Sequence, residues 1–192
     1  MSSADIVAEA YQSLTNDFTI YLFDRRKELP TSYSIEDMAK DTVEAIKALG
    51  LDQVNIFGVS QGDMIALEIA IEEPKLVKKL VLGSTTACVT ETMNQTIEEW
   101  ILLAKKKDAK ALYLSFGEAV YSKDVYEQSK NLLVEAAKTV TDDDMDRFVI
   151  LAESIDGFDV THDLDKIHCP VLVLGSKDDQ VLGSDATDII VE

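Results

Sequence analysis

The sequence predicts an α/β protein with a mainly parallel sheet flanked by helices. Short apolar segments of strand length alternate along the chain with segments of helical periodicity, which is the pattern of strand–helix–strand units. The apolar segments are continuous rather than alternating, as expected for strands covered on both faces. At 192 residues the chain has the size of one domain. The four predicted strands are Phe18–Phe23, Val54–Val59, Leu80–Gly83 and Val171–Leu174.

Two helices are predicted from their end signals. Ser34 and Asp37 have the spacing of a capping box, apolar residues follow at helical intervals, and Gly50 ends the pattern. The second helix begins at Gln61 and runs to just before Pro74. Because it is apolar on nearly every side, we expect it to be deeply buried.

Residues 90–154 carry helical patterning without a strand-like segment or a proline. More than sixty such residues between two parallel strands exceed an ordinary crossover connection. Thr141 and Asp144 predict a helix N-cap within this region. The expected organisation is therefore a partial core of residues 1–87 and 161–192 with a helical cap inserted at 88–160. Most aromatic residues of the insertion are expected to form its own core.

The pentapeptide Gly58-Val59-Ser60-Gln61-Gly62 joins a predicted strand to a predicted helix. This is the context in which a G-x-S-x-G turn exposes a serine hydroxyl above the ends of the strands. Gly58 and Gly62 would remove Cβ atoms that clash in so tight a turn, and the Gln61 N–H would face a developing oxyanion. A dinucleotide fingerprint is excluded because its third glycine is absent, and no phosphate-loop motif occurs.

Several segments together resemble the α/β-hydrolase family, in particular esterase and haloperoxidase-like members with a helical cap. They are residues 23–26 (FDRR), residues 33–39 (YSIEDMA), the nucleophile turn, and residues 168–178 (HCPVLVLGSKD). The resemblance implies an α/β-hydrolase fold that lacks the first strands and the last strand and helix. It also implies a serine nucleophile at Ser60, whereas haloalkane dehalogenases use an aspartate there.

By the same resemblance, Asp178 is the acid that orients a catalytic histidine. A carboxylate after a parallel strand would lie at the functional edge of the sheet. Asp179 is the neighbour most easily confused with it, and a solvated Asp-Asp turn is the alternative.

No histidine follows Asp178, although the family order is serine, acid, histidine. His168 precedes the last predicted strand and therefore belongs at the opposite end of the sheet, roughly 17–20 Å from Ser60. His162 lies farther upstream in a polar connection. Both are expected to be structural or surface residues, so the chain as given is expected to be inactive for want of a general base.

The amino-terminal part is short relative to the family. Residues 2–14 have the pattern of the helix that follows the family's oxyanion loop. The strand that the family places between Phe18–Phe23 and Val54–Val59 is absent, which would open a slot in the sheet. We therefore expect a fragment or partial gene product.

Asp63 departs from the family, which commonly has a small residue there. An aspartate suits the first turn of a helix. It would also place a negative charge near the oxyanion, so a modest loss of activity is expected.

The formal net charge of −18 makes a nucleic-acid partner unfavourable. No membrane segment or signal peptide is evident, which favours a cytoplasmic location. Nothing in the sequence implies a metal ion or an organic cofactor, and the oligomeric state is open. The sequence predicts a serine hydrolase of small ester or related acyl substrates; the alternative is a non-catalytic relative that uses the fold for binding or regulation.

Overall fold

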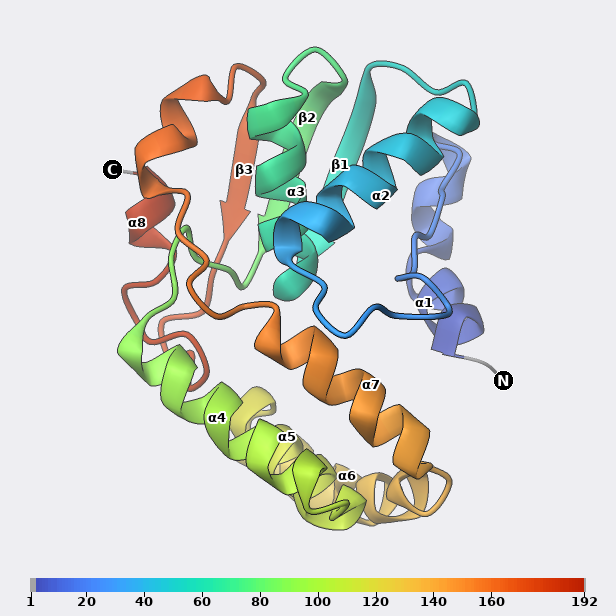
Figure 1. The fold of residues 1–192 in the computed structure, drawn as a ribbon, viewed down its shortest axis with the longest axis vertical. Coiled ribbons are helices and arrows are strands. Elements are labelled where there is room, and N and C mark those ends of the chain that lie inside the picture. Colours follow the sequence, from blue (N-terminus) through green and yellow to red (C-terminus); the bar gives the residue numbers. More distant parts are fainter. Residues whose placement is uncertain (1–2, 192) are drawn as a thin grey trace.

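The computed structural model describes residues 3–191 and contains a three-stranded parallel sheet (Figure 1). Its strands are β1 (Val54–Val59), β2 (Val77–Gly83) and β3 (Val171–Leu174), and β2 lies in the middle. In the register of the sheet, Val59 pairs with Gly83 and Gly83 with Leu174. The carboxyl ends of all three strands therefore meet at one edge. Three of the four predicted strands are confirmed, and β2 begins before the predicted Leu80.

Helices α2 (Ile35–Ala48) and α3 (Gln61–Glu72) lie in front of the sheet (Figure 1). The predicted capping box is present: Ser34 Oγ accepts a hydrogen bond from the Asp37 N–H, and the Asp37 carboxylate accepts one from the Ser34 N–H. Gly50 follows the helix with a φ of +69°, a conformation that favours glycine. The main core forms between these helices and the sheet.

Helix α3 is buried along most of its length, as predicted. Eight of its twelve residues are inaccessible to solvent, and Leu67 is fully buried. Because the helix packs against α2, β1 and β2 at once, only a narrow side remains for charged residues such as Glu72, which is exposed. This location fixes the start of α3, and hence the preceding turn, relative to the sheet.

The prediction of a strand at Phe18–Phe23 is wrong. This segment is an irregular connection, and Phe18, Tyr21 and Leu22 are each about half exposed. A strand needs a neighbour to satisfy its N–H and C=O groups. The described sheet pairs β1 with β2 and gives the apolar segment no such neighbour.

The second face of the sheet differs from the sequence-based expectation of burial on both sides. Phe57, Val59, Leu172 and Leu174 project from this face and are between 46% and 53% exposed. The ring of Tyr11 meets Phe57 edge-on at 5.4 Å between centroids. The strands therefore have the apolar composition typical of a sheet with helices on both faces. In this structure, helices α2 and α3 cover one of the two faces (Figure 1).

The amino-terminal helix α1 (Ser3–Ala10) is followed by the 3-10 turn η1 (Gln12–Asn16). Together they account for most of the helix predicted from residue 2, and Ser2 lies outside the described residues. The 3-10 turn η2 (Thr161–Lys166) precedes β3, and α8 (Asp188–Val191) lies near the carboxyl end.

Four helices form the lower part of the molecule in Figure 1. They are α4 (Glu91–Lys105), α5 (Ala109–Val120), α6 (Lys123–Ala137) and α7 (Asp142–Glu153). Trp100 is the centre of a separate apolar cluster here; its indole N–H donates to Ser115 Oγ at 3.1 Å, and its ring packs on Phe116. The chain leaves and re-enters this part at a short antiparallel bridge between Cys88 and Asp159.

Candidate active site

Ser60 lies where β1 ends and α3 begins, in the left-handed backbone region with a φ of +54°. Such a conformation is costly for a residue with a Cβ and is found where the surrounding structure imposes it. Here the Ser60 N–H donates to the Gly83 carbonyl at 3.0 Å, which ties the turn to the end of β2. The residue is exposed, and its hydroxyl group makes no capping hydrogen bond to α3. The hydroxyl is thus presented at the sheet edge instead of being used by the helix.

The two glycines of the turn have different roles. A Cβ on Gly58 would stand 2.5 Å from the Gly62 carbonyl oxygen and 2.5 Å from Asp63 Oδ1. The close packing predicted at Gly58 is therefore present. At Gly62 a Cβ would meet nothing within 4 Å, so the steric reason predicted for this glycine is wrong.

Gln61 is the first residue of α3, where backbone N–H groups have no partner within the helix. Its side chain joins two distant parts of the chain. The amide Oε1 accepts a hydrogen bond from Arg25 Nη2 at 3.0 Å, and Nε2 donates to the Leu151 carbonyl at 2.6 Å and to Ser154 Oγ at 3.1 Å. The residue beside the nucleophile is thereby fixed to the end of α7.

Sequence analysis did not predict a role for Arg25, which was quoted only as part of a family-like segment. Burial lowers the pKa of its guanidinium group, and its Nε atom is buried without a hydrogen-bond partner among the described residues. Arg147 of α7 reaches the same segment, where its Nη1 donates to the carbonyls of Arg26 and Lys27. No periodicity or motif signals these contacts, because Arg25 and Gln61 are 36 positions apart, and Arg147 and Arg26 are 121 positions apart.

Asp63 is fully buried, and its Oδ2 accepts a hydrogen bond from the Gly83 N–H at 2.6 Å. Burial raises the pKa of this carboxyl group to about 8, and the Gly83 hydrogen bond opposes the rise only in part. The side chain is therefore mostly protonated at neutral pH. Most molecules therefore lack the negative charge that was expected near the oxyanion, and the effect of Asp63 on activity stays a prediction.

Asp178 and Asp179 follow β3 and are distinguished by their contacts. Asp179 Oδ1 accepts hydrogen bonds from the N–H groups of Val181 and Leu182 at 2.9 and 2.8 Å, so it stabilises its own turn. Asp178 is exposed, and the hydrogen bonds found for it within residues 3–191 involve its main chain. Of the two acids, Asp178 has the carboxylate that is available to another group.

Both histidines are exposed, and His168 lies far from the turn. His162 belongs to η2, and His168 precedes β3. Since Leu174 and Val59 each pair with Gly83, the six residues from His168 to Leu174 separate its side chain from the Ser60 edge by roughly 20 Å. At that distance His168 cannot take a proton from Ser60, and the same expectation for His162 stays a prediction.

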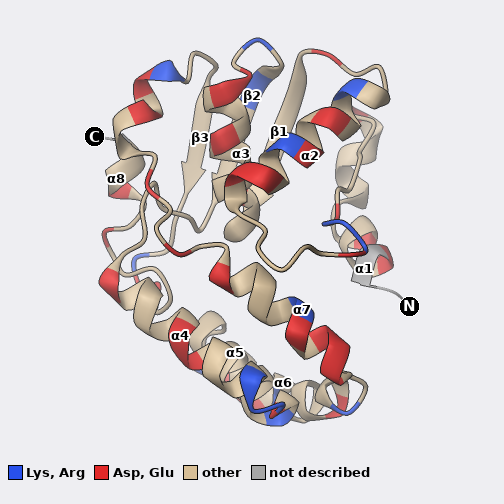
Figure 2. Ribbon diagram, in the orientation of Figure 1, with Lys and Arg blue, Asp and Glu red and all other residues tan. Residues whose placement is uncertain are grey.

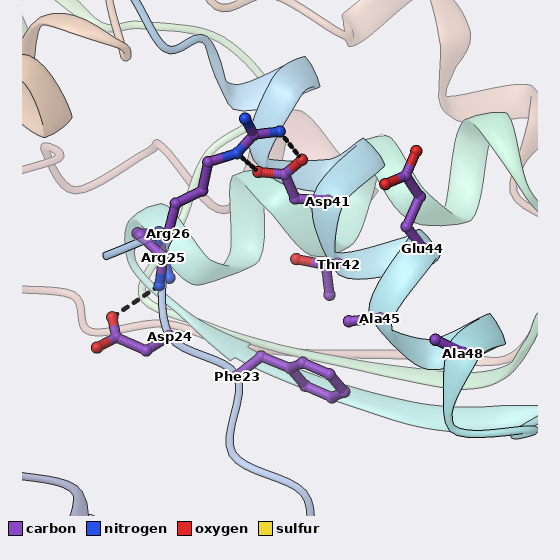
Figure 3. A pocket seen from close by; sticks show the side chains of 9 residues that line it. All are labelled: Phe23, Asp24, Arg25, Arg26, Asp41, Thr42, Glu44, Ala45 and Ala48. Carbon is purple, nitrogen blue, oxygen red and sulfur yellow. Dashed lines mark hydrogen bonds and ion pairs between the residues drawn. The ribbon is translucent and has the colours of Figure 1, made fainter. Parts of the chain in front are cut away.

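A pocket of about 410 Å³ lies between residues 23–26 and α2 (Figure 3). Arg26 forms an ion pair with Asp41 at its rim, and Tyr33 Oη donates to the same carboxylate at 2.5 Å. Arg26 thereby holds the pKa of Asp41 below its usual value. The pocket is lined by residues 23–26, beside which the sequence predicted a slot, and by α2; Arg26 and Asp41 are paired with each other across it.

Acidic residues are distributed over several elements, among them α2, α3, α4 and α7 (Figure 2). In contrast, all three arginines of the chain lie at residues 25, 26 and 147, which meet near the nucleophile turn. Within residues 3–191, no helix has both the length and the apolar character needed to cross a membrane.

The model of the alpha/beta hydrolase fold family matches residues 8–130, which are more than half of the chain. The chain belongs to the α/β-hydrolase family. The predicted family and fold are confirmed, and the chain is a hydrolase, an enzyme whose substrate is a small molecule.

Relatives and solved structures agree with this assignment. The protein named carbamate hydrolase RutD of Agrobacterium fabrum is 27% identical over 176 residues, which are 88% of this chain and 67% of the relative. The α/β hydrolase MGS-M2, from a Medee basin deep-sea metagenome library, matches with a TM-score of 0.83 at 24% identity, over 99% of this chain and 72% of that one. The enol-lactonase of Burkholderia xenovorans matches with a TM-score of 0.73 at 19% identity, over 85% and 62%.

Proposed function

We propose that this α/β-hydrolase uses Ser60 as the nucleophile in the hydrolysis of ester or related acyl substrates. The observation that carries the proposal is the left-handed backbone of Ser60 at the end of β1, with a hydroxyl group that does not cap α3. A helix that begins with a serine normally uses the hydroxyl for capping. The absence of this capping hydrogen bond lowers the stability of the helix, which favours a functional role for the Ser60 hydroxyl group.

In this mechanism, Ser60 Oγ attacks the substrate carbonyl carbon and gives a tetrahedral intermediate. The Gln61 N–H, at the positive end of α3, donates to the oxyanion as it develops. Loss of the alcohol or other leaving group gives an acyl-serine, which water then hydrolyses. Asp178 is proposed as the acid that orients a histidine base, because its carboxylate is the available one of the Asp178–Asp179 pair.

Both RutD and the enol-lactonase are named for substrates in which an acyl carbon is bonded to nitrogen or oxygen. That shared chemistry supports an acyl substrate for this chain. The proposal also includes residues 88–160 as a cap over the nucleophile turn, supported by the bridge at Cys88 and Asp159 and by the Gln61 contact with α7.

The alternative is a hydrolase relative that binds a ligand without turnover. The distance of His168 from Ser60 favours it, since proton transfer requires direct contact or one bridging water. For the same reason we expect the 192-residue chain by itself to show little reaction at Ser60.

Chemical rescue of the missing base tests the proposal. The chain is incubated with a fluorophosphonate, with and without imidazole as a soluble base, and covalent modification is located by mass spectrometry. We expect Ser60 to be modified faster with imidazole and the reaction to be lost in Ser60→Ala. Ser84→Ala is the matched control, because Ser84 ends β2 at the same sheet edge with a φ of +53°.

Absence of modification at Ser60 at any imidazole concentration would favour the binding alternative and refute the nucleophile. Rapid modification without imidazole would show that a base within the chain does reach Ser60. Equal loss of modification in Ser84→Ala would show that the sheet edge, and not Ser60, determines the reaction.

A further inference from the structure

The carboxyl group of Asp63 lies beneath the nucleophile turn without a counter-charge. Its Oδ2 accepts the Gly83 N–H at 2.6 Å, while Oδ1 is buried without a hydrogen-bond partner among the described residues. Oδ1 also fills the space beside Gly58, where an added Cβ would approach it to 2.5 Å. Asp63 thus touches both strands that support Ser60.

The Gly83 residue connects Asp63 with Ser60. Its N–H donates to Asp63 Oδ2, and its carbonyl accepts the Ser60 N–H at 3.0 Å. A displacement of Gly83 would therefore move the group that holds the strained Ser60 backbone. This two-step contact is the route by which Asp63 can act on the nucleophile.

We propose that Asp63 is a positioning residue whose neutral carboxyl group holds Gly83, and through it Ser60, in the conformation that presents the hydroxyl. This inference rests on the proposed role of Ser60. When Asp63 loses its proton, an uncompensated charge remains in the core beneath the turn. The same charge would oppose the oxyanion that forms next to Gln61. Both effects disfavour reaction in the ionised state.

The surroundings of Asp63 contain few groups that could offset such a charge. Burial is the largest cause of its raised pKa, and the Gly83 N–H is the group that lowers it. Strand β1 has no titratable side chain. None of the titratable side chains on the other elements packed against α3 is hydrogen-bonded or ion-paired to Asp63 among the contacts described for residues 3–191: Glu36, Asp37, Lys40, Asp41, Glu44 and Lys47 of α2, Lys78 and Lys79 of β2, and His162, Asp163, Asp165 and Lys166 of η2.

Nuclear magnetic resonance tests the proposal without requiring catalysis. The carboxyl carbon of Asp63 and the amide groups of Ser60 and Gly83 are followed from pH 5 to pH 10 in the labelled 192-residue chain. We expect one common midpoint near the pKa of about 8. Asp63→Asn, which keeps a carbonyl oxygen for Gly83, should abolish the titration of both amides.

Glu68→Gln is the matched control, because Glu68 lies on the same helix and burial also raises its pKa. This variant should retain the titration of Ser60 and Gly83. An ordinary acidic midpoint for Asp63, or amides that stay silent while Asp63 titrates, would overturn the proposal. So would amides that still titrate in Asp63→Asn.

Fluorophosphonate modification in the presence of imidazole then tests whether the protonation state of Asp63 changes the reactivity of Ser60. Well below the midpoint pH of Asp63, the Asp63→Asn variant and the wild type should be modified at nearly the same rate. One pH unit above the midpoint, about one wild-type molecule in ten keeps the Asp63 proton, so the variant should react about tenfold faster. A constant ratio of the two rates would contradict the proposal. If Ser60 is not modified at any pH, the proposed nucleophile fails, while the magnetic-resonance titration still decides the role of Asp63.

Discussion

At the scale of single residues, the nucleophile turn depends on one glycine more than on its partner. Because Gly58 has no Cβ, the first turn of α3 can pass within 2.5 Å of the position that a Cβ atom would occupy. At Gly62 an added Cβ would meet no atom within 4 Å. The G-x-S-x-G pattern presents the two positions as equivalent. Their difference follows from how α3 leaves the sheet.

Gly58→Ala is expected to destabilise the protein by about 1–3 kcal/mol, because the methyl group would overlap backbone that cannot move independently. Gly62→Ala is the matched variant, and we expect it to be neutral or to stabilise the helix by up to about 1 kcal/mol. Urea unfolding of both variants measures the difference. Equal costs would show that the turn relaxes around a side chain at Gly58.

Asp63 makes the stability of the fold depend on pH in a defined direction. In the unfolded chain the group releases its proton near pH 3.8, whereas in the native state it keeps it up to about pH 8. Between these values the unfolded state binds fewer protons than the native state. The contribution of the Asp63 carboxyl group to the free energy of unfolding is therefore fully present below about pH 4. It declines as the pH rises and is lost above about pH 8.

We expect the free energy of unfolding of the wild type to fall relative to Asp63→Asn by up to about 1.4 kcal/mol per pH unit within that window. Urea unfolding at intervals of one pH unit measures the slope for both proteins. Asp124→Asn, at an exposed position of α6, serves as the control and should parallel the wild type. Parallel curves for the wild type and Asp63→Asn would mean that Asp63 is ionised in the native state.

At the scale of elements, α7 is held to the sheet region by polar contacts near its middle and at its carboxyl end. Gln61 contacts its carboxyl end through Leu151 and Ser154, and Arg147 contacts the segment that carries Arg25. These contacts differ from those within α4–α7, where the apolar cluster around Trp100 dominates.

Gln61→Leu should loosen this attachment, because the Leu151 carbonyl loses a donor and Arg25 loses its acceptor. We expect a cost of about 1–3 kcal/mol. Hydrogen exchange followed by mass spectrometry should show faster exchange in residues 142–154 and 25–27, with α2 unchanged. Gln95→Leu is the control, since Gln95 is exposed on α4 and bonds to Glu91 of its own helix. Unchanged exchange around α7 would contradict a holding role for Gln61.

At the scale of the whole molecule, the two faces of the sheet contribute unequally to the stability of the fold. Leu82 faces α3 and is fully buried, whereas Leu172 lies on the opposite face and is 53% exposed. Parallel strands with apolar residues on both faces are typical of sheets with two helical layers. In this structure one layer supplies most of the burial.

Leu82→Ala is expected to cost about 2–5 kcal/mol, as for other truncations in a packed core. Leu172→Ala, the same change in the neighbouring strand, should cost less than about 1 kcal/mol because little contact is lost. Urea unfolding of the two variants gives the comparison. A large cost at Leu172 would show that its face is covered in solution.

The sequence by itself determined the features that depend on neighbours along the chain. The capping box at Ser34, the helix N-cap at Thr141, the buried character of α3 and the strand–turn–helix context of Ser60 were all predicted correctly. Each is set by residues within a few positions of one another, where spacing alone carries the physical constraint. Family membership followed from several such segments in order.

Tertiary structure decided what depends on contacts between distant residues. Phe18–Phe23 has strand composition but no strand, because pairing requires a neighbour that composition cannot supply. Asp63 resembles an ordinary helix-start aspartate, yet burial against Gly83 keeps it protonated. The contact of Arg25 with Gln61 likewise appears only when the chain folds. Burial and hydrogen-bond partners are properties of the packed molecule, and they set the charge and position of the groups around Ser60.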